Sequence, residues 1–157
     1  MENINQDDFT LSCFALLEET FEKAPVKTGG FYLDADTSLF ATIDKLSGEQ
    51  ASTSVGENEA TIASHLEHIR FYLTVLKQFI SQNETDVVDW KQSWLVNTVD
   101  ESEWEELKKA VGNDYRDLKE TLKKFESWNE KKIAGAMAIV THSAYHLGAI
   151  RQIIKIL

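Results

Sequence analysis

Apolar residues recur every three or four positions along most of this 157-residue chain. Such spacing places them on one face of a helix, and the strict alternation of a half-buried strand is missing. The chain has one proline, Pro25, and seven glycines, so its composition does little to interrupt long helices. The pattern indicates four long amphipathic helices, over residues 5–24, 58–81, 100–125 and 129–157. The sequence therefore predicts an all-α fold: a four-helix bundle with a long connection between helices one and two.

Polar residues suited to capping mark the expected helix starts. Asn58, Asp100 and Asn129 each precede an apolar-striped segment, and Glu103 follows Asp100 at the spacing of a capping box. Residues 25–56 form the long connection, which contains a short apolar stretch of helical spacing near its middle.

Size and charge narrow the class of protein. With 43% hydrophobic and 27% charged residues, residues 1–157 are expected to form a single globular domain. The net charge of −10 and the pI near 4.8 argue against a nucleic-acid partner, because such proteins usually carry a concentrated basic face.

The cysteine content and the apolar segments indicate where in the cell the protein is expected to lie. Cys13 is the only cysteine, and residues 1–8 lack the features of a secretory signal, so we expect a cytoplasmic protein. We expect no membrane span, because polar or charged residues interrupt the apolar C-terminal segment. They are His142, His146, Arg151 and Lys155.

All four histidines lie in two close pairs, His65/His68 and His142/His146. Residues three or four apart share a helix face, so each pair can point at one object. In the last helix both histidines belong to a core-facing stripe. The stripe is Gly135, Ile139, His142, His146, Ala149 and Ile153. A third histidine from the other pair would complete the three-ligand set typical of an open, zinc-type site.

The same histidines also fit a simpler role as hydrogen-bonded residues of the core. Burying several titratable rings together without an ion costs desolvation and risks mutual repulsion, which favours a metal. Spacing alone leaves both interpretations open.

The first pair poses a choice between His65 and His68. The stripe through Ile62, Leu66 and Ile69 places His65 inside the apolar arc and His68 at its edge. Periodicity alone therefore favours His65.

Two motifs give the chain a resemblance to a known family. They are TIASHLEHI, residues 61–69, and HSAYHLGAIRQ, residues 142–152. In these motifs, and in helix order over nearly its whole length, the chain resembles the DinB-like family of bacterial four-helix metal proteins. The resemblance implies that His68, His142 and His146 are the ligands. His65 is left as a supporting group or an alternative ligand.

The resemblance also implies a range of activities. The family includes thiol-dependent transferases and isomerases that use low-molecular-weight thiols, and proteins described as metal-dependent hydrolases. The leading hypothesis is thiol transfer to a small electrophile at a divalent ion, with zinc or nickel as the expected metal. The alternatives are hydrolysis by metal-bound hydroxide and a non-catalytic, metal-stabilised dimerisation module. The expected partners are a small-molecule substrate, a low-molecular-weight thiol and a second copy of the chain.

Other candidate residues carry weaker signals. Cys13 fits a buried apolar position better than a nucleophile. The four tryptophans are more typical of packing anchors than of a substrate wall. Glu67 faces away from His68 on an ideal helix, where a charged residue is expected to meet solvent. The sequence assigns no general base and no catalytic residue.

Overall fold

The structure is a computed structural model that describes residues 5–23, 30–57, 59–82 and 87–157. Within these ranges it is 69% helical and contains no strand, which confirms the predicted all-α class.

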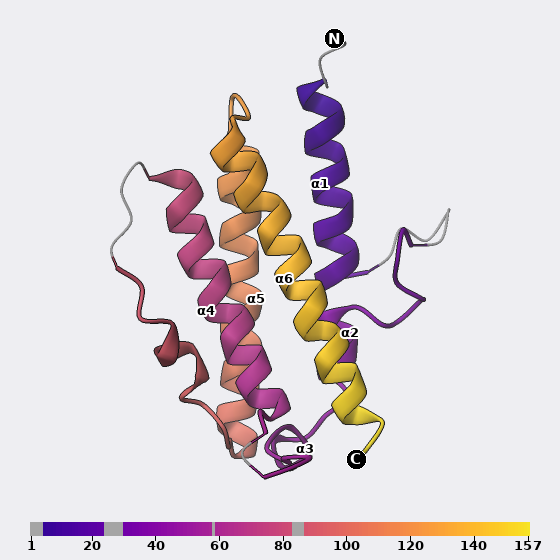
Figure 1. The fold of residues 1–157 in the computed structure, drawn as a ribbon. Coiled ribbons are helices and arrows are strands. Elements are labelled where there is room, and N and C mark those ends of the chain that lie inside the picture. The colour runs from indigo at the N-terminus through magenta and orange to yellow at the C-terminus, as the bar shows by residue number, and fades with distance from the viewer. Residues whose placement is uncertain (1–4, 24–29, 58, 83–86) are drawn as a thin grey trace.

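Four helices are much longer than the others (Figure 1). They are α1 (Gln6–Phe21), α4 (Ile62–Ser81), α5 (Glu101–Lys123) and α6 (Glu130–Ile154). Two short helices, α2 (Leu39–Ile43) and α3 (Gly48–Ala51), lie in the connection between α1 and α4, and a 3₁₀ helix, η1 (Trp90–Trp94), lies between α4 and α5. Helix α4 packs against both α5 and α6, and α1 packs against α6.

Side-chain caps define where the long helices begin. Asp100 and Glu103 form the predicted capping box of α5, and Asn129 caps α6 by accepting a hydrogen bond from the backbone of Lys132. The prediction that Asn58 caps the second long helix is wrong. Helix α4 begins at Ile62 with Thr61 as its cap, and Asn58 itself lies outside the described residues. Threonine and asparagine both accept hydrogen bonds at this position, so local sequence did not separate them.

Helices α4 and α6 approach each other closely at Gly135. A Cβ atom at this position would lie 2.1 Å from Cγ2 of Ile80, so the contact excludes any larger residue. The approach lies two turns before His142 along α6 and brings the histidine-bearing faces of the two helices together.

Helix α6 is long and apolar enough, by length and composition, to cross a membrane. The central helix of a packed domain has the same properties. Helix α6 packs against α1 and α4, and 44% of its most apolar 18-residue window is buried.

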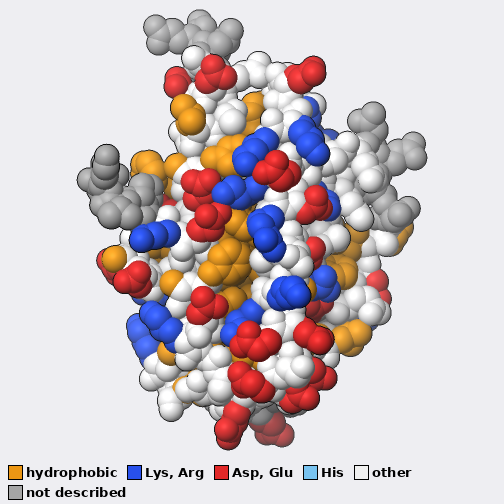
Figure 2. All heavy atoms as spheres, turned by 180° about the vertical axis from the view of Figure 1, so that it is seen from behind, with side chains coloured by type: hydrophobic (Ala, Val, Ile, Leu, Met, Phe, Trp, Pro, Cys, Tyr) orange, Lys and Arg blue, Asp and Glu red, His pale blue; other side chains and the backbone are white. Residues whose placement is uncertain are grey.

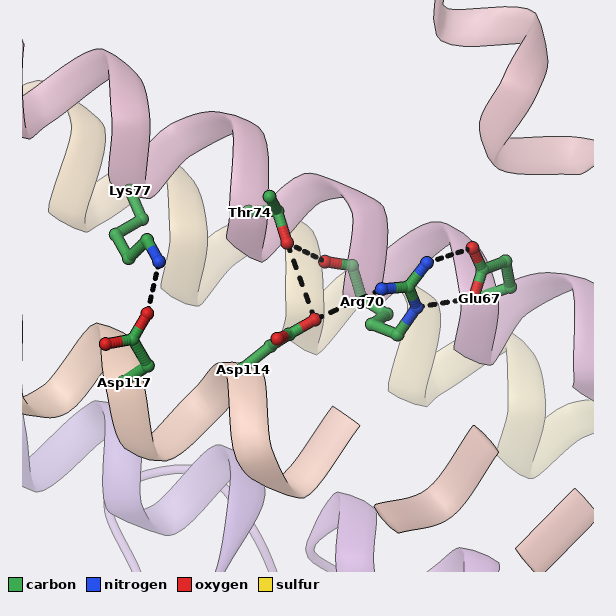
Figure 3. Close-up of polar contacts among 6 residues, drawn as sticks. All are labelled: Glu67, Arg70, Thr74, Lys77, Asp114 and Asp117. Atoms are coloured by element: carbon green, nitrogen blue, oxygen red, sulfur yellow. Dashed lines mark hydrogen bonds and ion pairs between the residues drawn. The ribbon is translucent and has the colours of Figure 1, made fainter. Parts of the chain in front are cut away.

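Charged side chains of both signs are interspersed on the face shown in Figure 2. Lys119 on α5 pairs with Glu18 of α1 and with Glu22, the C-cap residue of that helix. On the α4 side, Arg70 binds Asp114 of α5 and Lys77 binds Asp117 (Figure 3). These pairs join α5 to both neighbours and leave no broad basic area on the face shown.

A buried carboxylate fastens the connection to α1. The side chain of Glu19 accepts backbone N–H bonds from Phe31, Tyr32 and Leu33 at 2.8, 2.8 and 2.7 Å, and the residue is fully buried. A Cβ atom at Gly30 would lie 2.1 Å from the same carboxylate, so the backbone passes close to it. One side chain thus satisfies three backbone donors of a segment without regular structure.

We predict that Glu19→Ala lowers the free energy of unfolding by about 3 kcal/mol, because hydrogen bonds to a buried charged group contribute roughly 1.5–3 kcal/mol each and are not additive. Glu19→Gln should cost less, because the amide keeps one acceptor oxygen. Urea denaturation measures both, with the exposed Glu126→Gln as the matched control. A loss in Glu19→Ala no larger than in the control would contradict this role for Glu19.

Candidate metal centre

Helices α4 and α6 bring three histidines together at their interface. One ring nitrogen each from His68, His142 and His146 lies within 4.8 Å of the others. Among the described histidine, cysteine, aspartate and glutamate residues, this is the group placed to hold an ion, and His65 is not part of it. These are the three residues that the family resemblance implies.

The spacing of the donors fits a small cation after a modest adjustment. An equilateral triangle with sides of 4.8 Å has its centre about 2.8 Å from each corner, whereas zinc–nitrogen bonds are about 2.0–2.1 Å. Movement of each ring by less than about 1 Å would bring the donors to bonding distance. The group can therefore hold a metal ion without rearrangement of the helices.

His68 is more deeply placed than periodicity indicated. It is 6% exposed, whereas His65 is only partly buried, so the interpretation that put His65 inside the arc and His68 at its edge is wrong. The physical reason is the segment that contains η1, which packs against α4 and covers the side of the helix where His68 lies.

Two of the three histidines are held through Nδ1 by a neighbouring side chain. Nδ1 of His68 lies 2.7 Å from Oγ of Ser93, and Nδ1 of His146 lies 2.9 Å from Nδ1 of His65. Neither contact involves Nε2 of His68 or of His146. Nε2 of His142 is buried and has no hydrogen-bond partner. A buried nitrogen without a partner is costly, and a cation supplies the missing interaction.

Burial keeps these rings neutral near pH 7. Burial, with a smaller contribution from the neighbouring histidines, lowers the pKa of His142 to about 4 and that of His146 to about 3. The pKa values of His65 and His68 are also lowered, chiefly by burial. Neutral imidazole is the form that binds metal, so no proton has to leave these rings before an ion can bind at neutral pH.

Aromatic rings enclose the cluster. Tyr72 stacks on His142 with ring centroids 3.7 Å apart, and Trp94 stacks on His68 at 4.1 Å. Trp90 packs against Tyr72 at 5.7 Å. These rings restrict the orientations that the imidazoles can adopt and lower the local polarity around them.

The tryptophans divide into two kinds, which the sequence did not separate. Trp90 and Trp94 are partly exposed and lie beside the histidines. Trp104 is fully buried and donates a hydrogen bond to the carbonyl of Leu46 at 2.8 Å, and Trp128 packs on Phe9. The last two are packing anchors.

Thr61 and Ser64 of the first motif have a structural role. The Thr61 hydroxyl donates to the carbonyl of Asn97 at 2.7 Å, and the Ser64 hydroxyl donates to the Asn97 side chain at 3.0 Å. Both bonds join the start of α4 to the chain that follows η1. They help to hold η1 against α4 and therefore beside His68.

Glu67 does not face solvent as the sequence suggested. It is 9% exposed and pairs with Arg70, whose guanidinium also reaches Asp114 (Figure 3). Glu67 and Arg70 line a cavity of about 530 Å³ with residues of α5, whereas the histidines lie between α4 and α6. Glu67 is therefore no candidate for a base at the histidine cluster.

Cys13 is buried, and burial raises the pKa of its thiol to about 11. A thiol with so high a pKa is protonated at neutral pH and is a poor nucleophile. This agrees with the interpretation of Cys13 as a core residue.

Comparison with protein-family models, curated proteins and solved structures finds no match for this chain. Membership of the DinB-like family therefore stays a prediction that rests on the two motifs.

We predict that replacing the ligands and replacing His65 have different effects. His68→Ala or His142→Ala should weaken zinc binding by at least about 100-fold, whereas His65→Ala should weaken it by about 10-fold, as is typical of an outer hydrogen-bond partner. Competition with a chromophoric chelator measures the affinities, and circular dichroism checks the fold. A larger loss in His65→Ala than in His68→Ala would show that His65 is the ligand.

We also predict a pH dependence of the metal-free protein. The folded-state pKa values of His142 and His146, about 4 and about 3, lie below the ordinary value of 6.5. As the pH falls below 6.5 the unfolded chain therefore takes up protons first, and the free energy of unfolding decreases toward pH 4. Urea denaturation between pH 7 and 5 measures this slope. His146→Gln should reduce it, and an unchanged slope would contradict the assignment.

Proposed function

We propose that this chain is a divalent-metal-dependent enzyme of the DinB-like type, with zinc or nickel held by His68, His142 and His146. The single observation that carries the proposal is the gathering of one ring nitrogen from each of these three histidines between α4 and α6, together with the buried, unpartnered Nε2 of His142. In this proposal the four long helices form a four-helix bundle within one domain, residues 1–157. The chain between α1 and α4 is its long connection.

A three-histidine ion leaves positions open for a further ligand, and it lowers the pKa of a water or thiol bound there. The protein supplies the fixed donors and a surrounding of aromatic rings that excludes water from part of the site. The surrounding contains Tyr72 and Trp94 in direct contact with ligand rings. This support applies equally to transfer and to hydrolysis.

We propose thiol transfer as the reaction. A sulfur–carbon bond forms between a low-molecular-weight thiol and a small electrophile, the bond from carbon to the leaving group breaks, and the thiol proton is released with that group. Hydrolysis of an ester or amide by water at the same ion is the alternative, and it differs in needing no thiol.

We predict that the zinc- or nickel-loaded, untagged protein accelerates loss of a chromogenic aryl halide in the presence of one thiol from a panel. His142→Ala should reduce the rate at least about 100-fold, because it removes a ligand. Thr141→Ala, an exposed neighbour on α6, is the matched control and should retain the wild-type rate.

Equal rates in wild-type protein and His142→Ala would reject the proposal. Turnover of esters or amides without thiol would favour hydrolysis instead. No turnover on either panel, together with a large fall in melting temperature on chelation, would favour a metal-stabilised module without catalysis.

Homodimerisation and a cytoplasmic location stay predictions. An apolar groove of about 180 Å³ between α1 and α6 supports the first, because it is lined by Phe9, Cys13 and Leu16 of α1 and by Met137 and Val140 of α6. Apolar surface of this kind suits a contact with another protein chain.

A further inference from the structure

Ser93 lies on η1, outside both histidine-bearing helices, and it is fully buried. Its hydroxyl oxygen is 2.7 Å from the carbonyl oxygen of Trp90 and 2.7 Å from Nδ1 of His68. No pattern in the sequence indicated a role for Ser93. Serine is common in the chain, and the contact joins residues 25 positions apart.

Counting protons assigns the direction of both hydrogen bonds. A carbonyl oxygen only accepts, so the single proton of the Ser93 hydroxyl must point at Trp90. Toward His68 the hydroxyl can then only accept, and Nδ1 of His68 must carry a proton. A neutral imidazole protonated at Nδ1 has its lone pair on Nε2, the nitrogen left free for the ion.

The orientation of the His68 ring is fixed from a second direction. Trp94, one residue after Ser93, stacks on the His68 ring with an interplanar angle of 19°. A ring held by a hydrogen bond in its plane and by a stacked indole on its face cannot rotate freely. Both contacts come from η1, which is held by the Asn97 hydrogen bonds to Thr61 and Ser64.

We propose that Ser93 is a positioning residue for the metal centre: through the chain of hydrogen bonds from His68 to Ser93 to the Trp90 carbonyl, it fixes the tautomer and direction of His68. The inference rests on the proposed metal site and adds a residue that acts through a ligand without touching the ion. Outer partners of this kind usually orient histidine ligands and strengthen metal binding.

The rival role for Ser93 is purely structural, because a serine that only closes the turn of η1 onto Trp90 would make the same bond to the carbonyl. The two roles differ in what they predict for His68. If Ser93 positions His68, removing the Ser93 hydroxyl changes the tautomer of the His68 ring, and its effect on zinc affinity requires His68 to be present. A purely structural serine predicts neither result.

The test uses Ser93→Ala with Ser143→Ala as the matched control. Ser143 is also buried and lies on α6 beside His142, but its hydroxyl has no hydrogen-bond partner. In Ser93→Ala we expect zinc affinity, measured by chelator competition, to fall by about 10- to 100-fold. Ser143→Ala should bind zinc as the wild type does. In a His68→Ala background, Ser93→Ala should cause no further loss, because Ser93 acts through that ring.

A second measurement reads the tautomer directly. Long-range ¹H–¹⁵N NMR spectra of the metal-free protein should show His68 protonated at Nδ1, and Ser93→Ala should shift it toward the Nε2-protonated form. Wild-type zinc affinity in Ser93→Ala, an equal loss in Ser143→Ala, or an Nε2-protonated His68 in the wild type would each overturn the inference. If the wild type binds neither zinc nor nickel, the proposed function fails, and the NMR measurement still decides whether Ser93 sets the tautomer.

Discussion

The packing of α4 against α6 is the contact on which the candidate site depends. Each helix supplies histidines three or four residues apart, and such pairs become one cluster only where the two helix faces meet in the correct register. The close approach at Gly135 and Ile80 contributes to that register, because a side chain at residue 135 would separate the helices. The apolar core and the site thus share one interface. A substitution that shifts α6 along α4 would move His142 and His146 away from His68.

This arrangement places neutral imidazoles where charged ones would be unstable. Burial lowers the pKa values of all four histidines, and proximity to one another lowers those of His65, His142 and His146 further. The same environment that favours metal binding at neutral pH therefore opposes protonation of the folded state. Protons compete with an ion for the ring nitrogens, and they also bind the unfolded chain more readily than the folded one. A fall in pH therefore weakens metal binding and lowers the free energy of unfolding.

Periodic patterns in the sequence correctly predicted the features that are determined within one helix. The all-α class and the caps at Asp100 and Asn129 follow from local spacing and local hydrogen bonds. Periodicity failed at His68, because its burial depends on η1, a segment with little helical signal of its own. The same limit explains why Ser93 was missed and why Trp90 and Trp94 could not be separated from Trp104. A contact between two segments far apart in the sequence does not change the spacing of apolar residues in either segment, so periodicity cannot reveal it.

The hydrogen bonds around the cluster also bear on the simpler interpretation, in which these are ordinary core histidines. Such residues would be expected to satisfy both ring nitrogens within the protein. Here the outward nitrogens of His68 and His146 are engaged, by Ser93 and by His65, while Nε2 of His142 remains buried without a partner. An unsatisfied buried group costs about 1–3 kcal/mol, and a closed hydrogen-bond network would avoid that cost. Two rings held through Nδ1, beside a third with a buried and unpartnered Nε2, form the arrangement expected of ligands to a cation.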